Sequence, residues 1–485
     1  MRVESIELRV VRLPLVAPFR TSFMTEYHRD ALLVCVRTPE GVEGWGECVA
    51  MQEPCFSAEY LNAAVDVMRR FLIPLIQDLP EVTAEDAASA FTAIKGHLMA
   101  KAALETAILD AELQLAGVSL ASRLGAEHDI VPAGVSVGIM DSVPELLDAV
   151  EGYLESGYQR IKLKIQRDWD EKPVRQVRER FGDHVPLQVD ANGAYTWDDL
   201  DDLVRLDEYN LLMIEQPFPY DDLWGHVLLS RRLAKGTPVC LDESVTSPAE
   251  AITAIKMGAA SIINIKPGRV GGYLAAKQIH DVCAEHGAQV WVGGMLETGI
   301  GRAANLALAA LPNFTLVGDL SASDRFFQQD VTPPFIMKDG HIAVPGEPGI
   351  GVRPYPDILE RAAREVPPIA IPVGKGAPHD AVCPHEAPWL GFPAPEPQAG
   401  SAHGQEPVQA GARGAGFAVQ PDARDADAVA QPAARDAGSV AQPAARDAGS
   451  VVQPAARKAE LAADNGTAAV APDRGKASAS LAPLL

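Results

Sequence analysis

The sequence has few aromatic residues, a shortage of positive charge and no long apolar segment. Phe, Trp and Tyr make up 6% of its 485 residues, and the formal net charge is −23 at pH 7. This negative balance argues against nucleic acid or an anionic membrane surface as a partner. No run of about 18 apolar residues is present, so we expect no segment that spans a membrane. The charged first residues also differ from a secretory signal peptide.

Cysteine is scarce as well, and its distribution excludes a disulfide framework. The chain has six cysteines, without CxxC spacing. Several of them lie in apolar, strand-like contexts, as Cys35 does in ALLVCVRT. Such residues are typical of reduced core cysteines. We therefore expect a cytoplasmic protein.

Five short segments between residues 161 and 301 run from apolar residues into a charged one. They end, at intervals of about 25 residues, at Lys164, Asp190, Glu215, Asp242 and Lys266. A helix-length stretch with apolar residues at three- and four-residue spacing separates each pair. Serial strand–helix units of this kind predict a parallel (β/α) barrel, in which the carboxyl ends of the strands share one face. The five charged side chains are therefore expected to converge on one cavity.

These residue types indicate metal-assisted acid–base chemistry. Three carboxylates without cysteine or histidine suit a hard cation bound through oxygen, Mg²⁺ first and Mn²⁺ as a substitute. A lysine beside a cation should have a lowered pKa and can act as a general base. A single charged strand end is usually a helix cap or a surface charge, but five in register favour a site. They predict removal of a proton next to a substrate carboxylate, with the metal neutralising the enediolate.

Motifs in this region resemble the enolase superfamily, in its muconate-lactonizing branch. Those with the strand-end residues are KLK at 162–164, DAN at 190–192, EQP at 215–217, DES at 242–244 and NIKPGRVGG at 264–272. Three others are similar to the o-succinylbenzoate synthase/N-acylamino acid racemase group: GWGECVAMQEP at 44–54, GGMLETGIGRAANLALA at 293–309 and GDLSASDRF at 318–326. The resemblance covers about residues 1–370.

The resemblance implies an α/β fold, a (β/α)7β TIM-like barrel with an N-terminal α+β capping domain. The expected parts are the capping domain at 1–125, the barrel with the active site at 126–325, a segment returning to the cap at 326–372 and a tail at 373–485. Apolar patterning predicts cap strands at 5–15, 30–38 and 42–48, and cap helices at 57–77 and 98–117. The first, seventh and eighth barrel strands are predicted at 131–139, 288–294 and 314–320.

The tail differs in composition from the rest of the chain. From about residue 373 it is rich in Ala, Pro, Gly, Asp and Arg. An eleven-residue repeat, typified by QPAARDAGSVA, begins at Gln420, Gln431, Gln442 and Gln453. Each repeat contains proline and almost no large apolar residue, so we predict a disordered tail.

By the resemblance, Asp190, Glu215 and Asp242 would hold Mg²⁺, and Glu243 would support a lysine. Lys164 would remove the α-proton, while Lys266 would stabilise the enediolate from the opposite face. The implied reaction is that of o-succinylbenzoate synthase, the syn-dehydration of 2-succinyl-6-hydroxy-2,4-cyclohexadiene-1-carboxylate to 2-succinylbenzoate in menaquinone biosynthesis. The alternative is N-succinylamino acid racemase, or both activities. A non-catalytic barrel is a further alternative, which the complete set of charged residues argues against.

The expected partner is a small-molecule carboxylate, bound by an enzyme that is a homo-oligomer. The residues predicted to contact it are Phe19, Met51, Ser136, Lys162, Asn192, Gly293 and Met295. Some of these have a second interpretation: Phe19 and Met51 as core residues, Ser136 as a satisfied core hydroxyl and Asn192 as a turn residue. We leave Glu297 and Asp324 out of the catalytic set.

Overall fold

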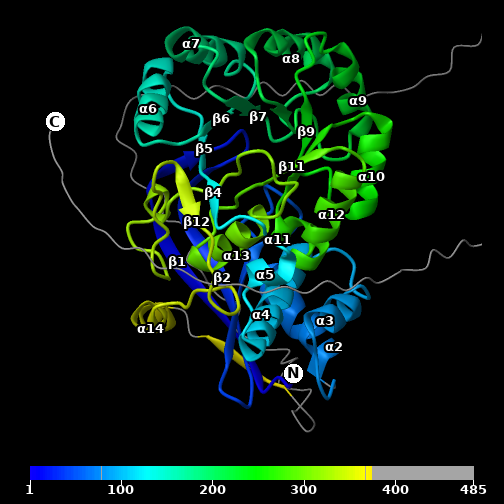
Figure 1. The fold of residues 1–485 in the computed structure, drawn as a ribbon, viewed down its shortest axis with the longest axis vertical. Helices are drawn as coiled ribbons and strands as arrows, with labels where there is room; N and C mark the ends of the chain where they lie inside the picture. The colour runs from blue at the N-terminus through cyan, green and yellow to red at the C-terminus, as the bar shows by residue number, and fades with distance from the viewer. Residues whose placement is uncertain (78, 366–367, 374–485) are drawn as a thin grey trace, which may run out of the picture. The chain divides into compact units, whose positions relative to one another are not determined.

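The computed structural model describes residues 1–77, 79–365 and 368–373. The predicted disordered tail lies outside these residues, apart from its first position. The described residues belong to one compact unit, which contains an antiparallel sheet and a larger parallel sheet (Figure 1). No helix in this part of the chain combines the length and the hydropathy needed to cross a bilayer. The domain limits near residues 125 and 325 stay a prediction.

The antiparallel sheet has the strand order β13-β1-β2-β3. Its strands are β1 (Ser5–Arg20), β2 (Thr25–Arg37), β3 (Glu43–Cys48) and β13 (Ile369–Pro372). The first two are longer than their apolar patterns predict. The pairing of β1 with β2 shifts register between Pro14 and Phe19, which fits a proline that cannot donate to the ladder. Beyond this shift, the end of β1 carries Phe19 toward the parallel sheet.

Helices cover the antiparallel sheet on one side. They are α1 (Leu61–Val67), α2 (Ile73–Gln77), α3 (Ala84–Phe91), α4 (Leu98–Ala116) and α5 (Leu120–Leu124). The helix predicted at 57–77 begins later and contains a π-turn, Met68–Leu72. By contrast, α4 has its predicted bounds and ends at Gly117, whose φ of 68° suits glycine. It packs closely on β3, because a Cβ at Gly46 would collide with the carbonyl of Ala103.

The parallel sheet contains seven strands in sequence order, and it curls into a barrel-like layer. The strands are β5 (Gly134–Val137), β6 (Arg160–Lys164), β7 (Leu187–Asp190), β8 (Ile214–Glu215), β9 (Val239–Leu241), β10 (Ile262–Ile265) and β11 (Gln289–Val292). Their near-continuous apolar sequences are typical of strands buried on both faces. The architecture is therefore the predicted α/β barrel with an N-terminal cap.

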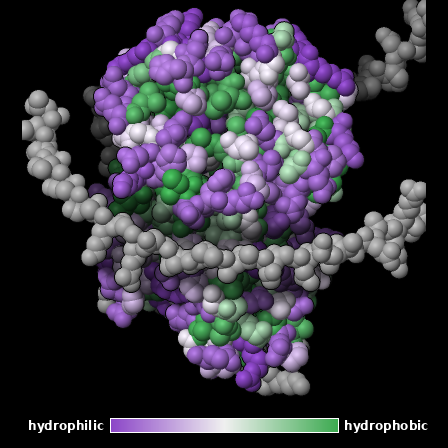
Figure 2. Space-filling view, in the orientation of Figure 1, coloured by the Kyte–Doolittle hydropathy of each residue, from purple (hydrophilic) through white to green (hydrophobic). Residues whose placement is uncertain are grey.

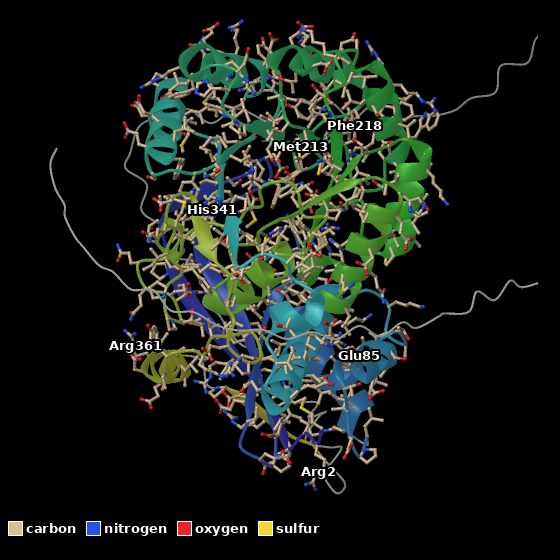
Figure 3. The ribbon with its side chains drawn as sticks, in the orientation of Figure 1. Arg2, Glu85, Met213, Phe218, His341 and Arg361 are labelled. Atoms are coloured by element: carbon tan, nitrogen blue, oxygen red, sulfur yellow. The ribbon has the colours of Figure 1, made fainter. Side chains whose placement is uncertain are left out.

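Helices follow one another around the outside of this sheet (Figure 1). They are α6 (Val143–Glu155), α7 (Glu171–Phe181), α8 (Leu200–Arg205), α9 (Leu223–Arg232), α10 (Pro248–Met257), α11 (Pro267–Val270), α12 (Tyr273–Glu285) and α13 (Gly299–Ala309). Met213 and Phe218, which flank β8, lie inside this ring of helices (Figure 3). Hydrophilic side chains cover much of the outer surface seen in Figure 2.

The two ends of the barrel differ from the prediction. The strand expected at 131–139 is split, because β4 (Ile130–Pro132) pairs antiparallel with β12 (His341–Ala343), and only β5 joins the parallel sheet. The segment 314–320 forms no strand; it makes a single bridge between Gly318 and Ala133.

A buried arginine explains why the eighth strand is missing. Nη2 of Arg160 donates to the carbonyl oxygen of Val317 at 2.9 Å, and its Nη1 donates to Oδ1 of Asp319 at 2.9 Å. The side chain thus takes a carbonyl group that a ladder between neighbouring strands would use. On the other edge, the backbone N–H of Asp319 still donates to Val292 at 2.9 Å. The irregular segment therefore closes the barrel between β11 and β5.

Candidate active site

A cavity lies between the carboxyl ends of the parallel strands and the cap. Its walls contain six of the seven predicted substrate-binding residues, namely Phe19, Met51, Ser136, Lys162, Asn192 and Met295. Lys164 and Lys266 line it as well. Gly293 does not; its neighbour Gly294 does. A Cβ at Gly293 would lie 2.3 Å from Oδ1 of Asn264 and 2.7 Å from Cε of Lys266, so this glycine leaves room for both side chains.

The three predicted carboxylates lie at neighbouring strand ends below the cavity. Asp190 ends β7, Glu215 ends β8 and Asp242 directly follows β9, and all three are fully buried. Their partners are mostly cationic side chains. Within the described residues, no cluster of three or more His, Cys, Asp or Glu side chains is close enough to coordinate a metal as it stands. The carboxylates are directed to the lysines and to neutral amide donors.

Lys164 and Lys266 face the cavity from opposite sides. Nζ of Lys164, at the end of β6, lies 2.6 Å from Oδ2 of Asp190 and 2.7 Å from Oδ1 of Asn192. Nζ of Lys266, just after β10, lies 2.6 Å from Oδ2 of Asp242. Since β6 and β10 are four strands apart in a layer of seven strands closed by one irregular segment, they stand across the barrel from each other.

Lys162 lies among the carboxylates. Its Nζ is 3.2 Å from Oδ2 of Asp190 and 3.3 Å from Oε2 of Glu215, and it also donates to Asp319. Burial lowers the pKa of Lys162, but the charges of Asp319, Glu215 and Asp190 raise it well above its ordinary value. These carboxylates therefore favour the ammonium form of Lys162. Asp319 is not among the site residues predicted from the sequence, although it lies near the end of the predicted eighth strand at 314–320.

The carboxylates influence one another strongly. Burial raises the pKa of Glu215 to about 8, and the negative charge of Asp190 adds to this effect. Burial also acts to raise the pKa of Asp190, but the nearby Lys164 and Lys162 lower it far more. Two adjacent carboxyl groups are thus held at very different pKa values, as expected for like charges sharing one buried site.

The pKa of Lys266 is shifted in the direction opposite to that expected from the sequence. Burial lowers this pKa, but the negative charges of Asp242 and Glu243 outweigh burial and raise it. The prediction of a lowered pKa assumed a cation as the main neighbour. In this arrangement the nearest charges are carboxylates, which favour the ammonium form. Nζ of Lys266 also lies 4.7 Å from the centre of the Phe56 ring, a further contact that suits a cation.

The donor set fits a hard divalent cation. The three carboxylates supply only oxygen atoms, and no cysteine or histidine is needed. Oδ1 of Asp242 is buried and has no hydrogen-bond partner; the nearby Nε of Arg269, at 2.8 Å, is not aligned for a hydrogen bond. Glu215 accepts hydrogen bonds from Asn264 at 2.8 Å and from Gln188 at 3.3 Å, which orients it from below.

Asn192 combines the two roles considered for it. It has a φ of 46°, so it makes a strained turn, and its backbone N–H donates to Oδ1 of Asp190 at 3.0 Å. Its side chain accepts from Lys164 and donates to Oε1 of Glu243 at 2.9 Å. Asn192 therefore links Lys164, at the end of β6, to Glu243 in the DES motif after β9. Glu243 contacts this asparagine and acts on Lys266 through its charge.

Other cavity residues were not predicted as site residues. They are Thr21, Phe23, Met24, Glu26, Phe56, Gly134, Gly294, Leu296, Glu297, Arg302, Asp319, Ser321 and Phe326. Glu297, which is outside the predicted catalytic set, is among them. Asp324 is not among the cavity residues. Arg302 lies in α13, and no strand-end pattern marks it; only contact with the rest of the site identifies it.

Two family models match the chain. The model of the mandelate racemase/muconate lactonizing enzyme N-terminal domain matches residues 5–125, and the enolase C-terminal domain-like model matches residues 145–358. Together they cover the antiparallel sheet except β13 and the parallel sheet except β5.

Two curated relatives match nearly over their full lengths. An N-succinylamino acid racemase from an Amycolatopsis species is 57% identical over 360 residues, which are 74% of this chain and 97% of that protein. An o-succinylbenzoate synthase from Geobacillus stearothermophilus is 47% identical over 352 residues, which are 72% of this chain and 93% of that protein.

Solved structures agree with these matches. An enolase superfamily member from Listeria innocua superposes with a TM-score of 0.71 at 39% identity, covering 74% of this chain and 97% of that one. A muconate lactonizing enzyme from Pseudomonas fluorescens, complexed with muconolactone, gives a TM-score of 0.70 at 25% identity, covering 74% of this chain and 98% of that one. The chain, with its cap, its curled parallel sheet and its strand-end lysines and carboxylates, belongs to the enolase superfamily, in the mandelate racemase/muconate lactonizing enzyme family.

Proposed function

We propose that this protein is an o-succinylbenzoate synthase, which dehydrates 2-succinyl-6-hydroxy-2,4-cyclohexadiene-1-carboxylate to 2-succinylbenzoate. The proposal rests mainly on one observation, the two lysines that face each other across an apolar cavity above three buried carboxylates. This arrangement suits removal of a proton next to a substrate carboxylate. Relatives that carry the synthase name, at 47% and 45% identity, support the choice of reaction.

Asp190, Glu215 and Asp242 would hold Mg²⁺, with Mn²⁺ as a substitute. Enzymes of this superfamily are generally Mg²⁺-dependent, and the all-oxygen donor set of these residues fits that ion. The bound cation would neutralise the negative charge that develops on the substrate carboxylate as the proton leaves. Lys162 adds a fixed positive charge beside the same carboxylates.

Lys164 would carry both proton transfers of the dehydration. In its neutral form it takes the proton from the ring carbon that bears the carboxylate. The resulting ammonium group then gives this proton to the hydroxyl group on the neighbouring carbon, which leaves as water. One residue on one face of the ring is enough, and the proton count balances. Lys266, opposite, stays an ammonium group and stabilises the developing negative charge.

The remaining cavity residues would bind the substrate. Phe19, Met51 and Met295 supply apolar contacts for its carbon skeleton. The hydroxyl group of Ser136 is buried, faces the cavity and has no hydrogen-bond partner among the described residues, so it is available to a polar group of the substrate. Asn192 orients Lys164 through the hydrogen bond at 2.7 Å.

N-succinylamino acid racemase is the second candidate, and two specific observations favour it. The Amycolatopsis relative with this name is 57% identical. In addition, a racemase needs a base on each face of the substrate, and Lys164 and Lys266 are placed for that. Both reactions begin with loss of the α-proton, so one site can support both.

A direct assay tests the proposal. Purified protein with Mg²⁺ is given the cyclohexadiene substrate and, separately, one enantiomer of an N-succinylamino acid. We expect dehydration, which the rise in absorbance of the benzoate product measures. Racemisation is measured by the loss of optical rotation. Racemisation without dehydration would make the second candidate the answer. Absence of both activities would refute the proposal.

A further inference from the structure

Glu47, in β3 of the cap, is bound to the first turn of a barrel helix. Its side chain is buried. It accepts hydrogen bonds from the backbone N–H of Thr298, at 3.1 Å to each carboxylate oxygen, and from the hydroxyl group of Thr298 at 2.7 Å. It also accepts from the N–H of Gly301 at 3.0 Å. A carboxylate from another part of the chain thus satisfies N–H groups that a helix start leaves unpaired.

Two further hydrogen bonds hold the start of α13. Asp330 accepts from the N–H of Gly299 at 2.8 Å, and Oγ1 of Thr298 accepts from Ile300 at 3.3 Å. Gly301 must be small, because a Cβ there would lie 2.9 Å from Oε2 of Glu47. The carboxylate of Glu47 therefore packs directly against the first turn of α13.

Both ends of this contact lead directly into the cavity. Met51, which lines it from the cap, follows Glu47 by four residues. On the barrel side, cavity residues 294–297 end directly before Thr298. Arg302, within α13, also lines the cavity and donates to the carbonyl of Glu297 at 3.1 Å. Glu47 thus joins the cap wall of the cavity to its barrel wall.

We infer that Glu47 is a positioning residue for substrate binding. Its contact with Thr298 sets the distance across the cavity between Met51 of the cap and residues 294–297 of the barrel. Glu47 does not touch the substrate itself. Loss of its contact with Thr298 should let the two walls separate and weaken substrate binding, while Lys164 and Lys266 stay in place. The inference rests on the proposed function for the identity of the ligand.

A second buried carboxylate of the cap provides a matched comparison. Oε1 of Glu105, in α4, accepts from the N–H groups of Tyr273 and Leu274, at 2.9 and 3.2 Å, at the start of α12. This contact also joins the cap to a barrel helix. However, neither of these α12 residues lines the cavity. A purely structural role of Glu47 would make the two carboxylates equivalent.

The experiment measures the dissociation constant of 2-succinylbenzoate by titration calorimetry with Mg²⁺ present, beside the KM and kcat of the wild-type activity. We expect Glu47→Gln to raise the dissociation constant and KM at least fivefold, with kcat changed less than twofold. Thr298→Val removes the hydrogen bond to Glu47 and the one from Ile300 without altering charge. It should act in the same direction if Glu47→Gln fails to fold. Thr298→Ser keeps the hydroxyl group and should bind as the wild type does.

Glu105→Gln is the control and should leave the dissociation constant within twofold of the wild type, even where its melting temperature falls. Equal weakening by Glu105→Gln, or unchanged binding in Thr298→Val and in a folded Glu47→Gln, would overturn the inference. A wild type that binds no 2-succinylbenzoate would also overturn it. Binding without turnover of either substrate would instead count against the proposed function, while the comparison of variants would still decide the role of Glu47.

Discussion

Lys164 and Lys266 are held by different groups, although both are lysines at strand ends. Lys164 has one carboxylate and one amide partner, Asp190 and Asn192. Lys266 has Asp242 as its hydrogen-bond partner, and the carboxylate of Glu243 also raises its pKa. The second environment favours a retained positive charge. This charge supports the proposed role of Lys266 in electrostatic stabilisation, opposite Lys164 as the base.

Arginine substitutions separate these two roles. Arginine keeps a positive charge but does not deprotonate near neutral pH. We therefore expect Lys266→Arg to retain measurable dehydration and to lose racemisation, whereas Lys164→Arg loses both. Steady-state rates with the cyclohexadiene and N-succinylamino acid substrates provide the measurement. Alanine variants at both positions give the background rate, and equal loss of dehydration in both arginine variants would contradict a one-base elimination.

Gly293 offers a test of how closely Lys266 is packed. A methyl group in Gly293→Ala would lie 2.3 Å from Oδ1 of Asn264 and 2.7 Å from Cε of Lys266, so both side chains would have to move. We expect kcat to fall at least tenfold, which is about 1.4 kcal/mol in the activation free energy. In the control Gly294→Ala, the nearest atom would lie at 3.2 Å, and we expect a smaller effect on kcat. Similar kcat values in the two variants would show that Lys266 has room to adjust.

The convergence of the site residues could be predicted because each one ends a strand in a repeated pattern. The register of a single strand was enough to predict the position of each of Lys164, Asp190, Glu215 and Lys266. Gly294 lines the cavity in place of Gly293, and one residue of register decides which of them does. Arg302 could not be found in this way, since its contact with the cavity depends on how α13 packs against the cap.

Among the elements, the eighth barrel position is one that the local sequence pattern did not predict correctly. Residues 314–320, FTLVGDL, have the apolar composition of a strand. Their backbone pairing is nevertheless decided by Arg160, which lies far away in sequence and takes the carbonyl group of Val317. By contrast, α4 could be predicted with its end because Gly117 provides a local stop signal.

The contact between α4 and α12 should depend on pH. Burial raises the pKa of Glu105 from 4.5 to about 8, although hydrogen bonds from Leu274 and Tyr273 oppose this shift. The folded state therefore holds the proton more tightly than the unfolded state does. The contribution of protonated Glu105 to the free energy of unfolding is fully present below about pH 4.5 and is lost as the pH rises through about 8.

Glu105→Gln should remove this dependence, because the amide oxygen can accept the same two hydrogen bonds and does not ionise. Between about pH 5 and 8, the free energy of unfolding of the wild type should fall relative to the variant, by up to about 1.4 kcal/mol for each pH unit. Urea unfolding at four pH values measures it. Glu40→Gln, at an exposed position, is the control. Parallel curves for the wild type and Glu105→Gln would mean that Glu105 ionises equally in both states.

For the whole molecule, the metal should contribute to stability as well as to activity. Asp190, Glu215 and Asp242 come from neighbouring strands and place several negative charges in one buried region. A cation bound there favours the folded state. At a Mg²⁺ concentration of a hundred times its dissociation constant, the free energy of unfolding should rise by about 2.7 kcal/mol.

Exhaustive chelation should therefore lower the melting temperature and abolish activity, and Mg²⁺ or Mn²⁺ should restore both. Calorimetry and the dehydration assay provide the two measurements. A variant with Asp242→Asn, in which one anionic ligand is lost, should show a smaller shift in melting temperature on chelation. Full activity after chelation would refute the metal site. The cytoplasmic location and the homo-oligomeric state stay predictions from the sequence.

The pairing of β13 with β1 has a consequence for how the protein is made. Ile369 to Pro372 complete a sheet whose first strand begins at Ser5, so all the barrel strands are synthesised before this second partner of β1, next to β2, exists. Until then, one edge of β1 exposes unpaired N–H and C=O groups, which attract strands of other chains. Contacts so distant in sequence also form slowly. A growing chain, or one cut short before residue 369, should therefore need protection from self-association at β1, the strand synthesised first.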